Sequence, residues 1–357
     1  MTTAVPTTTD EAARRRQAAL FLQMTRDSGE NRPSTLPYNR PLLLRLCYQH
    51  ALSEEARARF LEAFFERVGR DRNGEETESA ASPTGDSGTE SSCRYATAID
   101  DFADHLVDHL FLPLKAAATC AFNSVLNARR SSAATPGSLL EGTEAGPQED
   151  APQQGPHGEA DQQRTVCIFP PSPMTNADED GDLSEAGQRA ASLFSLLDDM
   201  ALSLLHTPSS RLAEQTHNTV RLDEYASHAF SRFQLVLVPA GGGSTEPPAY
   251  RLEAVDAEGN VATPSTSAVV VQHASPRLLA LHCAIARILY ASGVGQWIDA
   301  VLDDTAVEDL DADGTTNLGR LMQLRLDGWW NGSGQTGRGD DLASQFWVES
   351  SSFAVET

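Results

Sequence analysis

The sequence has almost no lysine. Lys115 is the only one, the other basic residues are arginines, and 27 Lys+Arg stand against 50 Asp+Glu for a net charge of −23. A chain this acidic is a poor non-specific binder of nucleic acid, because such binding depends on basic side chains that neutralise phosphates. Any contact with DNA must therefore rest on a local basic face.

Cysteines and long apolar runs are also scarce. The five cysteines are scattered, odd in number and free of any C-x-x-C pair, which argues against a disulfide framework and a cysteine zinc site. No apolar run approaches the length that crosses a bilayer, and the first residues lack the basic-then-apolar layout of a secretory signal. We therefore expect an intracellular protein, cytoplasmic or nuclear, that is not secreted and has no membrane association.

Two stretches with few large apolar residues interrupt the chain. Neither can bury enough apolar surface to offset the entropy of ordering, so both are expected to be disordered. The expected organisation is an N-terminal helical region over 1–70, a disordered insertion over 71–93, a helix over 94–130, a disordered linker over 131–163, a domain over 164–315, and a helix with a polar tail over 316–357.

Apolar spacing within the ordered parts predicts an α+β fold that is mostly helical with a few antiparallel strands. Expected helices are Asp10–Met24, a stretch over Arg40–Arg70 that Gly69 ends, one from Tyr95 that Pro113 bends or ends, Ala190–His206, and Arg277–Ala291, opened by Pro276 and stopped by Gly293. Expected strands are Thr165–Phe169, Phe233–Val238, Tyr250–Val255 and Ala268–Gln272.

His105 and His109 lie four residues apart and so share one helix face, a spacing that could hold a metal. The glutamate of an H-E-x-x-H site is missing, and three aspartates surround the pair in sequence. Surface histidines on an acidic helix are the favoured interpretation.

Several short motifs occur in a fixed order over roughly residues 95 to 315. They are Phe111-Leu-Pro-Leu-Lys115, Thr165-Val-Cys-Ile-Phe-Pro-Pro-Ser172, Asn218-Thr-Val-Arg-Leu222, Ala226-Ser-His-Ala-Phe230, Pro276-Arg-Leu-Leu-Ala-Leu-His-Cys-Ala284, Ser292-Gly293, Trp297-Ile-Asp299 and Asp313-Gly314. In order and spacing they resemble the motifs of the fungal HNH-nuclease-like proteins, a family with a ββα-metal site embedded in a longer helical protein.

The resemblance implies a metal-dependent endonuclease that hydrolyses phosphodiester bonds in DNA. In such a site a strand histidine activates water, an asparagine pins the hairpin loop, and a helix histidine helps to hold a divalent metal such as magnesium. The matching positions name Cys167 and Asn218 as the catalytic candidates and His228 as the metal-ligand candidate.

The sequence departs from the family where the chemistry would occur. Cys167 replaces the first histidine and is a poor base for water at an ordinary pKa. By register the second histidine falls on Ser227, which leaves His228 about 100° away around a helix. The family's R-D-x-x-x-C-x-x-T-G strand is also hardly present in the residues that follow Lys115.

These departures leave two hypotheses from different classes. The first is an HNH-endonuclease-like protein with a degenerate hydrolase site. The alternative is a non-catalytic helical binding or structural protein that uses the same scaffold. An unrelated helical interaction protein would also explain the apolar stripes, and in each case His282 is favoured as a satisfied core histidine.

Overall fold

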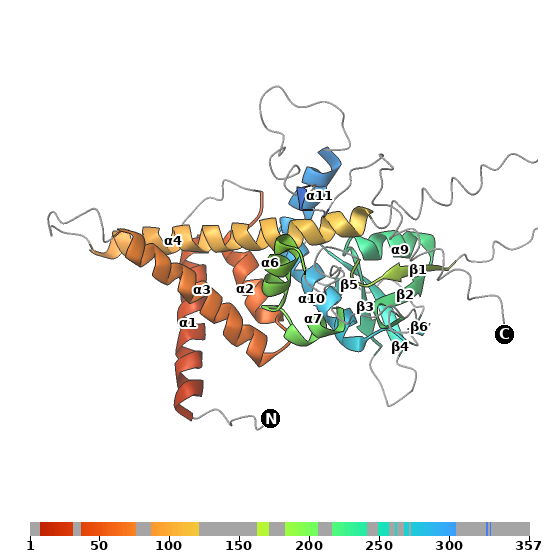
Figure 1. The fold of residues 1–357 in the computed structure, drawn as a ribbon, viewed down its shortest axis with the longest axis horizontal. Coiled ribbons are helices and arrows are strands. Elements are labelled where there is room, and N and C mark those ends of the chain that lie inside the picture. The colour runs from red at the N-terminus through yellow and green to blue at the C-terminus, as the bar shows by residue number, and fades with distance from the viewer. Residues whose placement is uncertain are drawn as a thin grey trace, which may run out of the picture.

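The computed structural model has the expected α+β fold, with mostly helical residues and short antiparallel strands in two small sheets (Figure 1). It describes residues 8–30, 37–75, 87–120, 163–170, 183–205, 216–240, 249–256, 261–262, 268–270, 273–304, 326–327 and 329. Residues 131–162 of the predicted linker lie outside the described residues. So do residues 330–357 of the predicted tail.

Four helices form the N-terminal half, and α4 crosses the others in Figure 1. They are α1 (Thr8–Glu30), α2 (Arg40–His50), α3 (Glu54–Glu75) and α4 (Ser87–Leu106). Their core is aromatic: the ring of Phe64 lies 4.9 Å from that of Phe21 and 6.0 Å from that of Phe102. Edge-on and tilted contacts of this kind are favourable beyond the area that they bury.

The region over 40–70 holds two helices, and Gly69 does not end the second one. α2 ends at His50, and α3 continues past Gly69 to Glu75. With α4 beginning at Ser87, the insertion predicted over 71–93 has helix at both edges, and 76–86 lies outside the described residues. A glycine weakens a helix by roughly 1 kcal/mol relative to alanine, which packing of the rest of α3 can override.

Gly69→Ala is expected to raise the free energy of unfolding by about 0.5 to 1 kcal/mol. A Cβ added at this helical position meets nothing within 4 Å, and alanine loses less backbone entropy on folding than glycine. Urea denaturation at equilibrium measures the change. A decrease in stability would show that the position tolerates no side chain.

Pro113 does not end the helix that begins in α4. The helix passes through η1 (Val107–Phe111), a π-helical turn, and residues 112–120 are helical again. Proline lacks an N–H and its ring clashes with the carbonyl four residues earlier, so a wider turn directly before it relieves both conflicts. The described residues after Lys115 are therefore helical where the family pattern would have a strand.

The single helix expected over Ala190–His206 is two helices, α6 (Glu185–Phe194) and α7 (Asp199–Leu205). Asp198 starts the second, because its Oδ1 accepts a hydrogen bond from the backbone N–H of Met200 at 3.0 Å. The carbonyl of Leu197, in the turn between them, accepts from the N–H of Leu52 at 2.9 Å. A cap and a tertiary contact thus override a continuous apolar stripe.

The strands form a hairpin-like pair and a second sheet. β1 (Arg164–Cys167) pairs with β2 (Thr219–Leu222), and β4 (Ala249–Val255) lies in the second sheet with β3 (Leu235–Pro239), β5 (Val261–Ala262) and β6 (Ala268–Val270) as antiparallel partners. Three of the expected strands are present within two residues of their predicted ends, and β6 begins at the predicted Ala268, with 271–272 outside the described residues. The short β5 was not predicted.

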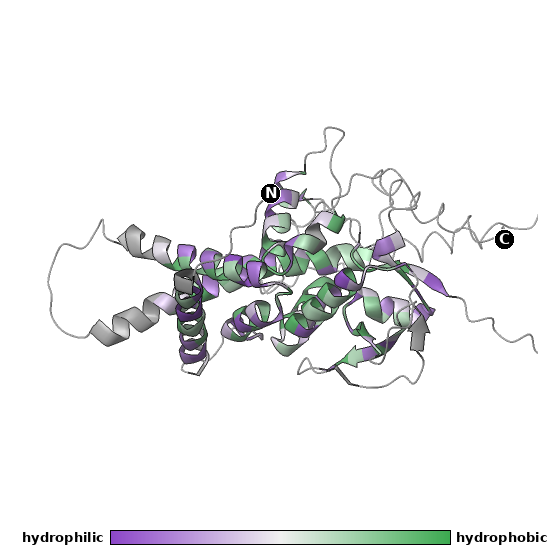
Figure 2. Ribbon diagram, turned by 90° about the horizontal axis from the view of Figure 1, so that it is seen from below, coloured by the Kyte–Doolittle hydropathy of each residue, from purple (hydrophilic) through white to green (hydrophobic). Residues whose placement is uncertain are grey.

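α10 (Pro276–Ala291) is the central helix and packs against α2, α7, β3, β4 and α11 (Val294–Asp304). Leu278, Leu281, Ile285 and Ile288 are all 0% exposed, so the predicted stripe is buried. Figure 2 shows mainly hydrophobic residues on the central helices. No single helix in the described residues is long and apolar enough to cross a membrane.

Gly293 ends α10 as predicted and lets α11 begin at once in another direction. Its φ of 81° is a left-handed conformation, which favours glycine. A Cβ there would also lie 3.3 Å from the carbonyl oxygen of Pro37. The turn therefore needs glycine for both its backbone and its packing.

Ile285→Val is expected to lower the free energy of unfolding by about 0.5 to 1.5 kcal/mol, because it removes one methylene group from a fully buried position. Equilibrium denaturation in urea measures it. An unchanged midpoint would contradict close packing around α10.

Candidate functional site

The pair of strands expected from the motifs is present, with a helix beside it. β1 and β2 are antiparallel, with Cys167 opposite Thr219, although about fifty residues containing α6 and α7 separate them in sequence. The chain then enters α9 (Glu224–Ser231), which packs against both strands. β1, β2 and α9 together are called the ββα unit below.

Asn218 fastens the end of this unit. Its side-chain oxygen accepts from the N–H of Phe169 at 3.0 Å, and its side-chain NH₂ donates to the carbonyl of Phe169 at 2.7 Å. The N–H of Ile168 also donates to the Asn218 carbonyl at 2.7 Å. The side chain thus extends the ladder past Cys167 and holds the strand end, the positioning role that the resemblance implies.

Cys167 lies at the end of β1 in a buried position. Burial raises the pKa of its thiol to about 12, and no described cation offsets that cost. The thiol therefore stays protonated near neutral pH and cannot act as a general base or as a thiolate ligand.

The phase of α9 is set by its cap. The Asp223 carboxylate accepts from the N–H of Ala226 at 2.7 Å, which fixes where the helix starts. Ser227 is 1% exposed, and its hydroxyl donates to the carbonyl of Leu222 at 3.3 Å. The position that matches the family's second histidine thus faces the strands, and it holds a neutral oxygen.

His228 is half-buried, one residue further around α9. Burial lowers its pKa, and the nearby guanidinium of Arg232 lowers it further. Among the described residues, no group of three or more His, Cys, Asp or Glu side chains could hold a metal ion. The residues at the matched positions therefore do not fit a magnesium site, since Mg²⁺ prefers oxygen ligands that include carboxylates.

A second polar cluster joins two of the matched motifs. The Nζ of Lys115 lies 2.8 Å from Oδ1 of Asp299 and donates to the carbonyl of Gly295 at 3.1 Å. Arg232 reaches the same carboxylate at 3.5 Å. The only lysine is thus 1% exposed and ties the helix over 112–120 to α11.

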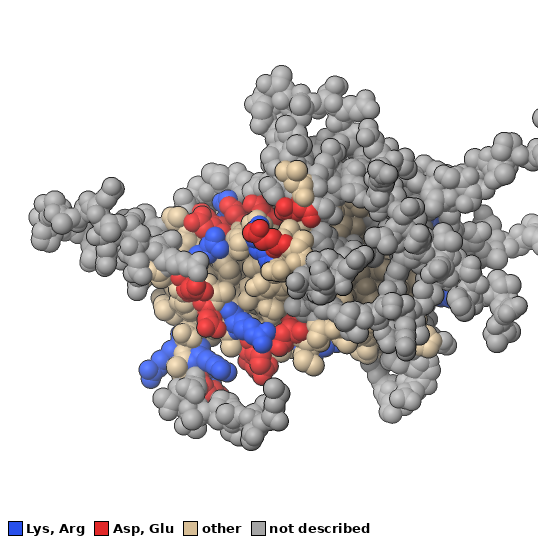
Figure 3. All heavy atoms as spheres, in the orientation of Figure 1, with Lys and Arg blue, Asp and Glu red and all other residues tan. Residues whose placement is uncertain are grey.

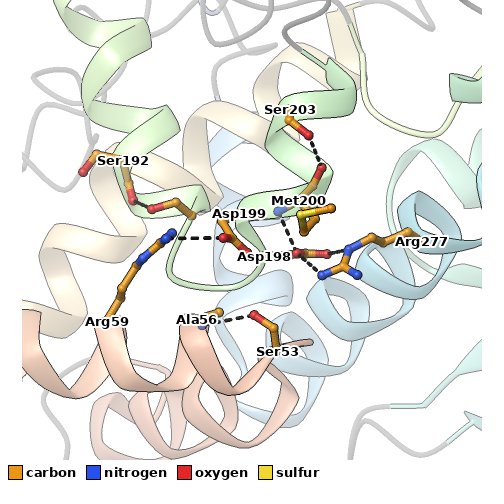
Figure 4. A network of polar contacts seen from close by, with 10 residues as sticks. Ser53, Ala56, Arg59, Ser192, Asp198, Asp199, Met200, Ser203 and Arg277 are labelled. Atoms are coloured by element: carbon orange, nitrogen blue, oxygen red, sulfur yellow. Dashed lines mark hydrogen bonds and ion pairs between the residues drawn. The ribbon is translucent and has the colours of Figure 1, made fainter. Parts of the chain in front are cut away.

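A third polar cluster joins α3, α7 and α10, and it is drawn in Figure 4. Arg277 donates to both oxygens of Asp198, at 2.6 Å each, and the carboxylate is 0% exposed. Next to it Arg59 reaches Asp199 at 3.3 Å, with both side chains partly exposed. Sequence reasoning missed Asp198, whose signal was its place as the first of two consecutive acids directly after two buried leucines.

His282 is a core histidine, as the sequence favoured. It is 1% exposed, its ring stacks on Phe230 at 4.0 Å and on Phe233 at 4.5 Å, and its Nε2 lies 3.1 Å from the Phe230 carbonyl. Its Nδ1 has no hydrogen-bond partner in the described region. Burial lowers its pKa to about 3, although the contact with the Phe230 carbonyl favours the charged form.

His282 is expected to make the protein acid-sensitive. Its folded pKa lies below the usual value of about 6.5, so the unfolded chain binds a proton that the folded chain excludes, and stability falls as pH drops below about 6.5. Within that window each pH unit changes the free energy of unfolding by about 1.4 kcal/mol. His282 therefore lowers the free energy of unfolding by about 2 to 3 kcal/mol between about pH 7 and pH 4.5.

Urea denaturation at both pH values tests this, with His282→Gln expected to remove that part of the loss. His273→Gln, at an exposed histidine, is the control and is expected to behave like the native chain. Equal pH dependence in all three proteins would contradict the assignment.

Comparison with protein-family models, with curated proteins and with solved structures finds no match for this chain.

Proposed function

We propose that this is an HNH-endonuclease-like protein whose catalytic site has decayed. The observation that carries the proposal is the ββα unit, in which Asn218 fastens the strand end as the family pattern implies. Cys167 and Ser227, at the two histidine positions, supply neither a base nor a charged ligand. The unit remains as a scaffold on which other helices pack.

Cleavage of supercoiled plasmid DNA in Mg²⁺ or Mn²⁺ tests the proposal. We expect the native chain to give no more nicking than the metal-free reaction. Cys167→His combined with Ser227→His is expected to gain metal-dependent nicking. Cys167→His with Ser231→His is the matched control, because Ser231 is a buried serine one turn further along α9.

Two outcomes would contradict the proposal in different ways. Robust cleavage by the native chain, abolished by His228→Ala, would show an active site that uses His228 after all. An inactive native chain with no gain in the double variant would favour the alternative, a non-catalytic helical binding or structural protein that uses the same scaffold. The helix over 112–120, where the family has a strand, supports that alternative.

DNA is the partner that the resemblance implies, and the charge of the surface argues against a strong contact. On the face in Figure 3, acidic and basic side chains are interspersed over the described residues instead of forming one basic patch. We therefore propose at most weak, salt-sensitive DNA binding through a local basic face. Free thiols at Cys47, Cys167 and Cys283 support an intracellular location.

A further inference from the structure

Four basic side chains lie near one another outside the ββα unit. They come from three helices, because α4 and η1 are consecutive parts of one continuous helix. They are Arg67 of α3, His105 near the end of α4, His109 in η1 and Arg189 of α6, and they are called the His–Arg cluster below. The two imidazole rings touch edge to face, with centroids 4.7 Å apart. α3 packs against α4 and α6 packs against η1, so each arginine lies on a helix that contacts a histidine-bearing segment.

Although aspartates lie near His105 in sequence, the charged groups that shift its pKa all have one sign. After burial, the causes that lower its pKa, to about 4, are Arg67, His109 and Arg189. The neighbourhood of His109 is mixed, because Asp108 and Asp327 act on it as well as Arg189 and Arg67. The Glu185 carboxylate, which is 90% exposed, forms an ion pair with one guanidinium nitrogen of Arg189 at 3.0 Å.

The cluster has unused hydrogen-bonding capacity. In the described residues Arg67 has no carboxylate partner, and neither imidazole has a hydrogen-bond partner. All four side chains belong to half-buried residues, so each is partly accessible to solvent. A local excess of donors at such a site is unexpected in a chain with a net charge of −23.

The chemistry of these groups discriminates between ligands. Two guanidinium groups next to the imidazoles repel a metal ion, although the spacing of the histidines alone would suit one. The same groups donate several N–H bonds, and a guanidinium matches the oxygens of a phosphate in geometry. The π-helical turn that holds His109 is a widened helical turn of a kind often found at binding sites.

We propose that the His–Arg cluster binds a phosphate group, carried by free phosphate or by a small phosphate monoester. Arg67 and Arg189 supply the fixed positive charge, and His105 and His109 add donors when they are protonated. Binding of phosphate then favours protonation of the two histidines, and their protonation strengthens the binding of phosphate by the same free energy. This site is independent of the ββα unit and of the proposed nuclease ancestry.

Isothermal titration of the full chain with inorganic phosphate and with a nucleoside 5′-monophosphate tests the site. We expect binding to at least one probe and an affinity lower by about tenfold or more in Arg67→Gln combined with Arg189→Gln, because each lost charged hydrogen bond is worth at least that factor. Arg15→Gln is the matched control, since Arg15 also pairs with a glutamate four residues earlier, Glu11. Binding of only one probe would identify the carrier.

Histidine NMR provides a readout that does not require the double variant to fold. Sulfate, whose charge is constant over the range from about pH 8 to pH 6, is expected to raise the pKa of His105 in the native chain, with the ring signals of exposed His273 as the control for non-specific effects of the salt. Absence of binding by both phosphate probes, or equal binding in the double variant and the control, would overturn the proposal. Tight binding of Zn²⁺ that depends on His105 and His109 would replace it with a metal site.

Discussion

Replacing Arg277 by methionine is expected to lower the free energy of unfolding by about 3 to 5 kcal/mol. Asp198 is 0% exposed, and both of its oxygens accept from this guanidinium at 2.6 Å (Figure 4). The Arg277 side chain is itself 37% exposed, but removing it leaves the buried Asp198 charge without compensation in a medium that solvates it poorly. The carboxylate must then take up a proton or draw water into the junction of α7 and α10.

The neighbouring pair provides a matched control in the same network. Arg59 and Asp199 lie 3.3 Å apart with side chains 47% and 28% exposed. Exposed pairs contribute between nothing and about 1 kcal/mol, so Arg59→Met is expected to cost less than about 1 kcal/mol. Equal losses in the two variants, measured by equilibrium urea denaturation, would show that burial of Asp198 does not decide the energy.

A double variant separates charge from shape. Arg277→Met combined with Asp198→Asn removes both charges, so it is expected to recover part of the loss seen in Arg277→Met alone. The asparagine can still accept from the N–H of Met200 and keep the start of α7. A double variant less stable than the single one would show that the carboxylate is needed for the cap itself.

The parts of the fold that the sequence predicted are those set by local pattern. The α10 stripe and the stop at Gly293 follow from spacing and from residues with strong conformational preferences. The strand pair next to Asn218 was implied by the resemblance. Contacts between distant segments overrode the pattern elsewhere. Asp198 divides one expected helix into two by capping the second, and its partner Arg277 comes 79 residues later.

In the candidate site, too, some features were predictable from short segments and others depend on contacts between distant segments. Motif order was enough to bring Cys167, Asn218 and α9 together, because a strand pair and its following helix are specified by short segments. The sequence could not show that Cys167 is buried with a raised thiol pKa, since burial depends on the whole chain around it. Nor could it predict the His–Arg cluster, whose four members come from three helices.

Lys115 shows how a single residue can be singled out by sequence while its role stays hidden. Its uniqueness and its place in the Pro113 motif marked it, but spacing alone did not predict that its partner would be Asp299. The pair connects two motifs that lie 184 positions apart. Its burial makes it the second place where one substitution has a large expected effect.

Asp299→Asn is expected to lower the free energy of unfolding by about 3 to 5 kcal/mol at neutral pH. Lys115 is 1% exposed and would keep the Gly295 carbonyl but lose the carboxylate at 2.8 Å, so its buried ammonium would lose a close counter-charge. Arg232 would lose the same partner at 3.5 Å. Asp101→Asn, at an exposed position on α4, is the control and should stay within about 0.5 kcal/mol of the native chain.

The pH dependence of the loss distinguishes a buried charge from a packing defect. In Asp299→Asn the folded pKa of Lys115 would fall below its usual value of about 10.4, so the folded variant would bind fewer protons than the unfolded chain in that window. Stability of the variant relative to the native chain should therefore recover as pH rises from about 7 to 10. Lys115→Met with Asp299→Asn should show no such recovery, whereas a constant deficit in Asp299→Asn would mean that packing alone is responsible.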